Sequence, residues 1–396
     1  MVTLTIGGCI EESSEKNKEE IEIEEDNMNK PSEEIQDSDK DIIADDEIKD
    51  DDQDSDIDTA PDDKPTDDDQ DSDNDTTSDV PVVNSPPVAV LEISGTIVAG
   101  TYEIDYVFDI SEDLTFSTYE SFDEDGEIVK FTLSLGTGET ISDTEPIDKQ
   151  YKYSYPGCYR VTLKVEDDSG GTNKTYKDIL LAEDVGLWAE YIISDDVYTE
   201  MYIEIDIFGD VVVDSAALTL LKTRLDQYIH KPDGITIDII QEKSTQNPTI
   251  STEEIWATMV AYRDRYTDSD TLSLYMMYLA ADHSEGGKLG GAFEATSIAV
   301  FKGSSFENIV NDKINSSEIE QALLCHEFFH LTGLVNIGYQ SNYPHELLGP
   351  LKDNHCRNDQ CVMYYQADTY DVSNYYSGEL PTELCYFCQE DMKRYD

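Results

Sequence analysis

The stretch Ala322-Leu-Leu-Cys-His326-Glu327-Phe-Phe-His330-Leu-Thr-Gly333 decides the fold of the C-terminal half of this chain. His326 and His330 are four residues apart, so on a helix they share one face and can bind one metal ion. Glu327 can take a proton from a water on that ion. Because the surrounding residues are apolar, we expect the helix to be buried. The pattern predicts a metal-dependent hydrolytic centre, although two inert histidines on a helix would fit these residues alone.

Features further along the chain strengthen the metal interpretation. Gly333 predicts that the helix ends in a left-handed turn, after which the chain can present a third ligand. Four cysteines follow in two short pairs, Cys356-x4-Cys361 and Cys385-x2-Cys388. This spacing is typical of a closed tetrahedral zinc site, and two disulfides are the alternative in an exported protein. We favour zinc, because two cysteines that are separated by two residues and sit on one turn strain as a disulfide.

Taken in order, the motifs His-Glu-x-x-His-x-x-Gly, His-Cys-x4-Cys-x-Met and Cys-x-x-Cys resemble those of archaemetzincins, a branch of the metzincin zinc metallopeptidases. The resemblance implies one catalytic and one structural zinc ion. The implied roles are catalytic ligand for His326, His330 and His355, base for Glu327, turn methionine for Met363, and structural ligand for Cys356, Cys361, Cys385 and Cys388. Tyr365 follows the turn methionine by two residues. It is a candidate for stabilising the oxyanion, with packing as its alternative role.

The third ligand departs from the family pattern. That family places its third histidine three residues after the glycine, where this chain has Asn336. An insertion from Leu334 to Asn354 then precedes His355 and contains a further histidine, His345. We expect His355 to be the third ligand, because it directly precedes Cys356 and keeps the family's spacing to the turn methionine. His345 is the alternative.

Residues 184–396 alternate strand and helix patterns, which predicts an α/β (α+β) metzincin-like domain with a twisted mixed sheet and the active-site helix packed on it. The strand patterns lie at residues 202–208, 235–240, 272–279 and 295–301, and the helix patterns at 214–229, 252–265 and from 316 onward. We expect strand 295–301 to run along the cleft and pair with an extended peptide. His283 lies in a polar, glycine-rich stretch and is expected to be solvated.

Residues 84–183 carry short alternating runs separated by turn residues, which predicts an all-β, immunoglobulin-like sandwich. The segments Phe122 to Val129 and Tyr153 to Gly170 resemble a PKD domain, a module of surface proteins. The family's Trp-Asp-Phe-Gly-Asp-Gly segment is replaced by Leu133-Ser-Leu-Gly-Thr-Gly138, which keeps the glycines and loses the Trp and both Asp. We therefore expect a spacer without a calcium or ligand role.

Residues 1–83 form the third predicted region, a disordered acidic tether. Residues 11–80 hold 32 Asp/Glu and 6 Lys without an aromatic residue, so they cannot bury enough apolar surface to fold. Ile6-Gly7-Gly8-Cys9 resembles the end of a truncated export signal, the box before the lipidated cysteine of prokaryotic lipoproteins. The formal net charge of −62 excludes nucleic acid as a natural partner and disfavours an anionic membrane surface.

These observations predict a monomeric zinc peptidase that cleaves peptide or protein substrates outside the cell. It would be displayed on the cell surface through a lipid anchor at Cys9, its only contact with the membrane. A zinc-bound water activated by Glu327 would attack the peptide carbonyl. Two alternatives are a surface binding protein whose metzincin-like domain has lost catalysis, and a cytoplasmic peptidase.

Overall fold

The computed structural model describes residues 83–98, 106–242, 247–310, 314–349, 353–367, 369 and 380–395. The predicted acidic tether and the proposed lipid attachment site, Cys9, lie outside these residues. Within them, no helix is both long enough and apolar enough to cross a membrane.

The N-terminal part of the described chain is a sandwich of two β-sheets. One sheet has the strand order β1-β3-β6, and the other has the order β2-β8-β7-β4-β5. The strands are β1 (Glu92–Ser94), β2 (Val107–Asp109), β3 (Leu114–Ser117), β4 (Ile128–Ser134), β5 (Thr140–Asp143), β6 (Asp148–Tyr151), β7 (Gly157–Asp167) and β8 (Thr172–Ala182). Alternate residues along β7, such as Val161 and Leu163, are buried with Phe116 of the opposite sheet. The alternating pattern therefore produces the predicted sandwich core.

The C-terminal part is built on a five-stranded sheet with the order β10-β9-β12-β15-β14. Its strands are β9 (Glu200–Phe208), β10 (Gly234–Glu242), β12 (Thr271–Leu279), β14 (Gly290–Glu294) and β15 (Ser297–Phe301). β9, β10, β12 and β15 are parallel, whereas β14 runs antiparallel to β15 and ends the sheet. A separate two-stranded sheet pairs β11 (Thr249–Ile250) with β13 (Asp282–His283). The predicted mixed sheet is thus present.

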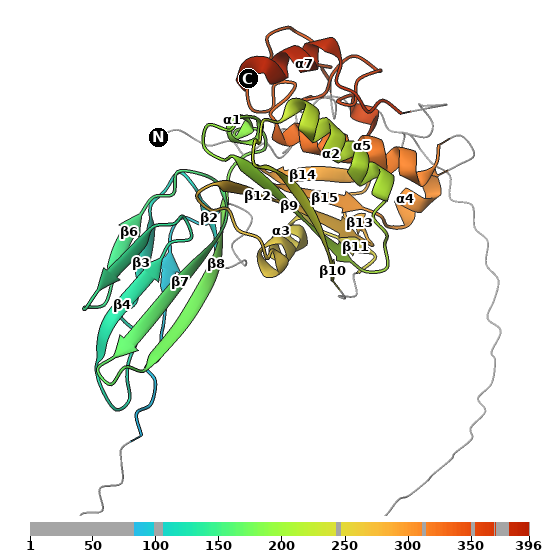
Figure 1. The fold of residues 1–396 in the computed structure, drawn as a ribbon. Coiled ribbons are helices and arrows are strands. Elements are labelled where there is room, and N and C mark those ends of the chain that lie inside the picture. Colours follow the sequence, from blue (N-terminus) through green and yellow to red (C-terminus); the bar gives the residue numbers. More distant parts are fainter. Residues whose placement is uncertain are drawn as a thin grey trace, which may run out of the picture. The chain divides into compact units, whose positions relative to one another are not determined.

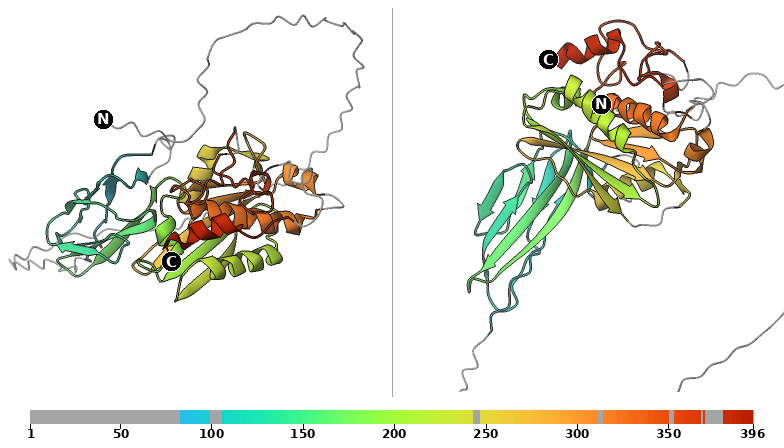
Figure 2. Two further views of the ribbon diagram at one scale, coloured as in Figure 1. Left: turned by 90° about the horizontal axis from the view of Figure 1, so that it is seen from above. Right: turned by 45° about the vertical axis from the view of Figure 1, so that its right-hand side comes forward.

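Helices cover both faces of this sheet (Figure 1). They are α1 (Ala189–Ile193), α2 (Ser215–Tyr228), α3 (Thr252–Tyr262), α4 (Ser304–Ile309), α5 (Ser316–Leu331) and α7 (Tyr386–Met392), with the short 3₁₀ helices η1 (Tyr365–Ala367) and η2 (Lys393–Tyr395). Helices α2 and α5 lie side by side on one face, as the views in Figures 1 and 2 agree, and α3 packs on the other. The parallel strands, covered on both faces, are accordingly rich in apolar residues.

Two expectations for this region were wrong. The strand at 295–301, β15, is not the sheet edge, because the antiparallel strand β14 pairs with it on its outer side. His283 is not solvated: it is 2% exposed, pairs with Ile250 in the two-stranded sheet and packs against the rings of Phe293 and Phe301.

Candidate metal centres

Helix α5 places two histidines in the interior of the C-terminal part. Asn315 caps its start by accepting a hydrogen bond from the Glu318 amide, and the Glu318 side chain accepts from the Asn315 amide in return. The helix is buried from Ala322 to Leu331, whereas its first turn, Ser316 to Glu318, is exposed or partly buried. Gly333 has φ of +75°, so the chain leaves the helix through the predicted left-handed turn.

Three histidines converge at this point. One ring nitrogen from each of His326, His330 and His355 lies within 4.8 Å of the others. The Nε2 atoms of His326 and His330 are 3.0 Å apart. Two nitrogens bound to one tetrahedral zinc at about 2.05 Å would be about 3.3 Å apart, close to this separation. The arrangement therefore fits a single ion held by three imidazoles.

The hydrogen bonds of the outer ring nitrogens, Nδ1, show which nitrogen each imidazole turns towards the centre. His326 donates its Nδ1 hydrogen to the Val362 carbonyl at 2.6 Å, and His355 donates its own to the Asp353 carbonyl at 2.9 Å. Because a carbonyl only accepts, each of these imidazoles presents the lone pair of Nε2 to the centre. The Nδ1 atom of His330 is buried and has no hydrogen-bond partner within the described residues.

Burial keeps the two helical imidazoles neutral. It lowers the pKa of His326 to about 4. Burial also holds the pKa of His330 well below its ordinary value of 6.5, and the neighbouring His326 and His355 lower it further. A neutral imidazole is the form that binds a metal ion, so this part of the site is prepared for one at neutral pH.

Glu327 lies next to His326 on α5 and is 1% exposed. Gly290, at the start of the edge strand β14, packs directly against it. A Cβ atom added to Gly290 would lie 3.1 Å from both Cγ and Oε1 of Glu327. The Glu327 carboxylate therefore lies against the edge strand of the sheet.

One loop supplies both candidate centres. It contributes His355 to the histidine set, Cys356 and Cys361 to the cysteine set, and the Val362 carbonyl that orients His326. The Cys356 amide donates to the Met363 carbonyl at 2.7 Å, which closes the loop, and Met363 is fully buried. Tyr365 begins the 3₁₀ helix η1 immediately after this loop.

The four predicted cysteines form the second cluster. The Sγ atoms of Cys356 and Cys385 are 3.6 Å apart, and those of Cys361 and Cys388 are 3.7 Å apart. A disulfide requires about 2.05 Å. Four sulfurs around a tetrahedral zinc at about 2.3 Å would be separated by about 3.8 Å. The cluster has the dimensions of a zinc site rather than of two disulfides.

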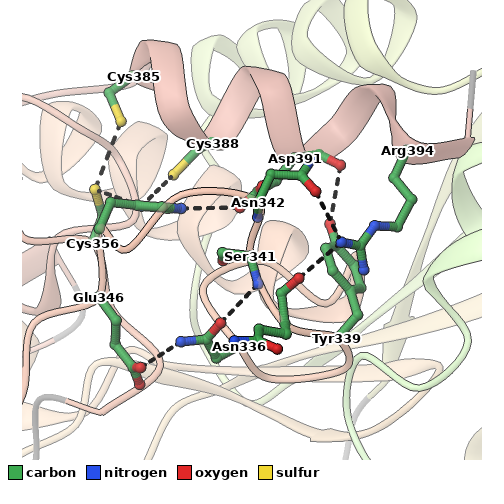
Figure 3. A network of polar contacts seen from close by, with 12 residues as sticks. Asn336, Tyr339, Ser341, Asn342, Glu346, Cys356, Cys385, Cys388, Asp391 and Arg394 are labelled. Carbon is green, nitrogen blue, oxygen red and sulfur yellow. Dashed lines mark hydrogen bonds and ion pairs between the residues drawn. The ribbon is translucent and has the colours of Figure 1, made fainter.

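The structure places His345 away from the three converging histidines. Its Nδ1 atom lies 3.5 Å from Cys356 Sγ and its Nε2 atom lies 2.9 Å from Asp391 Oδ2. Asn336 does not approach the histidines either: its side chain bonds to Glu346 and accepts from the Ser341 amide, within the insertion (Figure 3). Of the two candidates for the third ligand, His355 is the one that the fold brings to His326 and His330.

Sequence reasoning missed three contributors to these centres: Gly290, the Val362 carbonyl and Asp391. Gly290 had a detectable signal, since paired glycines in a strand often mark a close approach of another group. The carbonyl and Asp391 had none, because their roles depend on how the insertion and α7 fold back.

Comparison with known proteins identifies the sandwich. Residues 99–180 match the sequence model of the PKD domain family, which confirms the predicted PKD domain. The chain is 33% identical to collagenase ColA of Clostridium perfringens (strain 13 / Type A) over 102 residues, which is 26% of this chain and 8% of the collagenase. It is 35% identical to collagenase ColQ1 of Bacillus cereus (strain Q1) over 79 residues, 19% of this chain and 8% of the collagenase. It therefore spans less than a tenth of these relatives.

Solved structures show more distant similarity. The PKD1 domain of Vibrio anguillarum Epp is 28% identical, covering 25% of this chain and 96% of its own, with a TM-score of 0.20. Archaemetzincin from Methanopyrus kandleri is 14% identical, covering 50% of this chain and 96% of its own, with a TM-score of 0.33. Metalloproteinase-II from Bacteroides fragilis is 11% identical over 78% of this chain and 91% of its own, with a TM-score of 0.30. Function must therefore be argued from the residues of this chain.

Proposed function

We propose that this chain is a zinc-dependent peptidase of the metzincin type. The observation that carries the proposal is the convergence of three histidines: His326 and His330 lie with Glu327 in the buried half of α5, and His355 comes from the loop. Three neutral nitrogen ligands would hold a zinc ion and would leave a position for water or substrate, as in catalytic rather than structural zinc sites. The cysteine quartet is the proposed structural site.

The residues have distinct roles in the proposed reaction. Bound zinc supplies a Lewis acid that polarises a carbonyl and lowers the pKa of water. Glu327 is the base that accepts the proton of the attacking water and returns it to the leaving amine. Burial of the helix excludes bulk water, which strengthens the action of this carboxylate. Met363, which is fully buried, is the proposed turn residue, and the Tyr365 hydroxyl is the candidate donor to the oxyanion.

The edge strand β14 is the proposed docking site for the substrate backbone. It pairs with β15 on one side and is the last strand of the sheet. Its first residue, Gly290, contacts Glu327, so a peptide added beside β14 would pass close to the base. An extended peptide can satisfy the outer backbone groups of such a strand, which supports a peptide or protein substrate.

The substitution Glu327→Gln tests this function. Gln keeps the shape of the side chain and cannot accept the proton, so we expect hydrolysis of a fluorogenic peptide to fall about 10²- to 10⁴-fold. Zinc content, measured by elemental analysis, should remain that of the wild type. Glu307→Gln changes an exposed carboxylate on α4 and is the matched control, with full activity expected. Equal activity in Glu327→Gln and the control would refute the proposal.

Display outside the cell is part of the same proposal. The PKD domain supports it, as does the resemblance of Ile6 to Cys9 to a lipoprotein signal box. Labelling of cells with radioactive palmitate should mark the wild-type chain and leave the Cys9→Ser variant unlabelled. Equal labelling of both chains, or of neither, would contradict an anchor at Cys9.

A further inference from the structure

His345 and Asp391 form a buried pair beside the cysteine quartet. Both side chains are fully buried, and His345 Nε2 lies 2.9 Å from Asp391 Oδ2. The other ring nitrogen, Nδ1, lies 3.5 Å from Cys356 Sγ and 3.8 Å from Cys388 Sγ. Asp391 belongs to α7, the helix that also carries Cys388. The imidazole therefore stands between a carboxylate and two of the four sulfurs.

Both ring nitrogens of His345 face acceptors. A carboxylate accepts hydrogen bonds, and so does a thiolate that binds a metal. In this geometry an imidazolium, which carries hydrogen on both nitrogens, donates Nε2–H to Asp391 and Nδ1–H to Cys356. Four thiolates around a divalent ion leave an excess of negative charge in a buried place, and an N–H donor offsets part of it.

The surrounding contacts fix the pair in this orientation. The Asn342 amide donates to Asp391 Oδ1 at 2.8 Å (Figure 3). The Arg357 amide donates to the His345 carbonyl at 2.8 Å. The ring of Phe387 stacks on the imidazole, with centroids 5.8 Å apart and planes inclined by 20°. The contacts come from the insertion, from the loop that carries two cysteines and from α7.

We propose that His345 and Asp391 are an outer-sphere pair of the cysteine-bound metal, in which Asp391 orients His345 and His345 donates a hydrogen bond to the Cys356 thiolate. The pair slows release of the metal and connects the insertion to the loop that carries Cys356 and Cys361. It is a positioning pair and takes no part in hydrolysis. The inference rests on the proposed function in one respect, since it requires that the quartet binds a metal ion.

Two substitutions of His345 test the two ring nitrogens one at a time. In His345→Asn the amide nitrogen replaces Nδ1, so the donor to sulfur is kept and the contact with Asp391 is lost. In His345→Gln the amide nitrogen replaces Nε2, so the contact with Asp391 is kept and the donor to sulfur is lost. His230→Gln is the matched control, because the side chain of His230 is 70% exposed.

The measurement uses the full chain loaded with cobalt(II) in place of zinc. The sulfur-to-cobalt charge-transfer absorption reports on the quartet alone, because histidine ligands do not produce it. Its decay after addition of a chelator gives the rate of metal release. Loss of an outer-sphere partner of a metal ligand costs about 10- to 100-fold in affinity, so we expect release from His345→Gln to be faster by that factor. His345→Asn should lie between it and the wild type, and His230→Gln should match the wild type.

The outcomes distinguish this inference from the proposed function. Equal release rates in wild type, His345→Gln and His345→Asn, with the charge-transfer band present in all, would overturn the outer-sphere pair and leave the quartet intact. Absence of the band in the wild type would overturn both the outer-sphere pair and the metal-binding role proposed for the cysteine quartet. If His345→Gln does not fold, Asp391→Asn tests the same pair, because it keeps the shape while weakening the acceptor. Faster release from Asp391→Asn supports the pair, and an unchanged rate contradicts it.

Discussion

Gly290→Ala tests the geometry around the proposed base. The added methyl group would lie 3.1 Å from Cγ and Oε1 of Glu327 and 3.1 Å from Leu323 Cδ1. Ordinary contacts of this kind begin at about 3.4 Å, so Glu327 or the strand must move by a few tenths of an ångström. Because Leu323 closes the space on another side, we expect the carboxylate to be displaced.

The expected loss follows from the size of this displacement. A misplacement of about 1 Å can cost about 10²-fold in rate, so a shift of about 0.3 Å should cost about 4-fold in kcat/KM, or about 0.8 kcal/mol. Overpacking should also lower the free energy of unfolding by about 1–3 kcal/mol. Steady-state cleavage of a fluorogenic peptide, zinc analysis and urea denaturation give the three quantities.

Gly291→Ala is the control in the same strand. Its added methyl group would meet the Phe293 ring at 3.1 Å and has no atom of Glu327 among its nearest neighbours. Phe293 packs on the sheet face opposite α5, so the base should be unaffected. Wild-type kcat/KM in Gly290→Ala, or an equal loss in both variants, would refute the steric contact with Glu327 as the cause.

Three further predictions concern metal, protons and thiols. The metal-free protein should lose stability as the pH falls from 6.5 towards 4, because the pKa of His326 is about 4 in the folded chain and about 6.5 in the unfolded chain. This difference lowers the free energy of unfolding by about 3 kcal/mol, which urea denaturation measures across the pH range. A free energy of unfolding that does not change with pH would contradict this prediction. Cys385→Ser should release metal from the quartet and also weaken zinc binding at the histidines, since the quartet includes Cys356 and Cys361 of the loop that carries His355. Competition with a chelator measures both, and unchanged binding at the histidines would argue against this coupling. Cys158 and Cys325 should resist alkylation in the folded chain, because burial raises the pKa of each thiol to about 12; mass spectrometry after iodoacetamide treatment checks this, and rapid labelling would contradict it.

The sequence was most informative where a local pattern sets the structure. The burial of the apolar helix α5 and the left-handed turn at Gly333 depend on neighbours within a few residues, and the structure has both. The alternating runs of the sandwich are local in the same sense. They predicted the sandwich, and the resemblance of Phe122 to Val129 and of Tyr153 to Gly170 implied the PKD domain that the family comparison confirms at residues 99–180.

The predictions from sequence were wrong where contacts between distant segments determine the structure. The segment Gly290–Glu294 has little strand propensity of its own, and it becomes the edge strand because β15 offers a partner. His283 has polar neighbours in sequence, but the rings of Phe293 and Phe301 cover it. By contrast, the family's spacing favoured His355 over His345 as the third ligand, and the path of the insertion brings His355 to His326 and His330.

Anomalous diffraction at the zinc edge, from crystals of the full chain, tests the central claim most directly. We predict two peaks of comparable height. One should lie between the Nε2 atoms of His326, His330 and His355, and the other should lie among the four cysteine sulfurs. A single peak at the cysteines, or a peak coordinated by His345 in place of His355, would contradict the proposed catalytic centre.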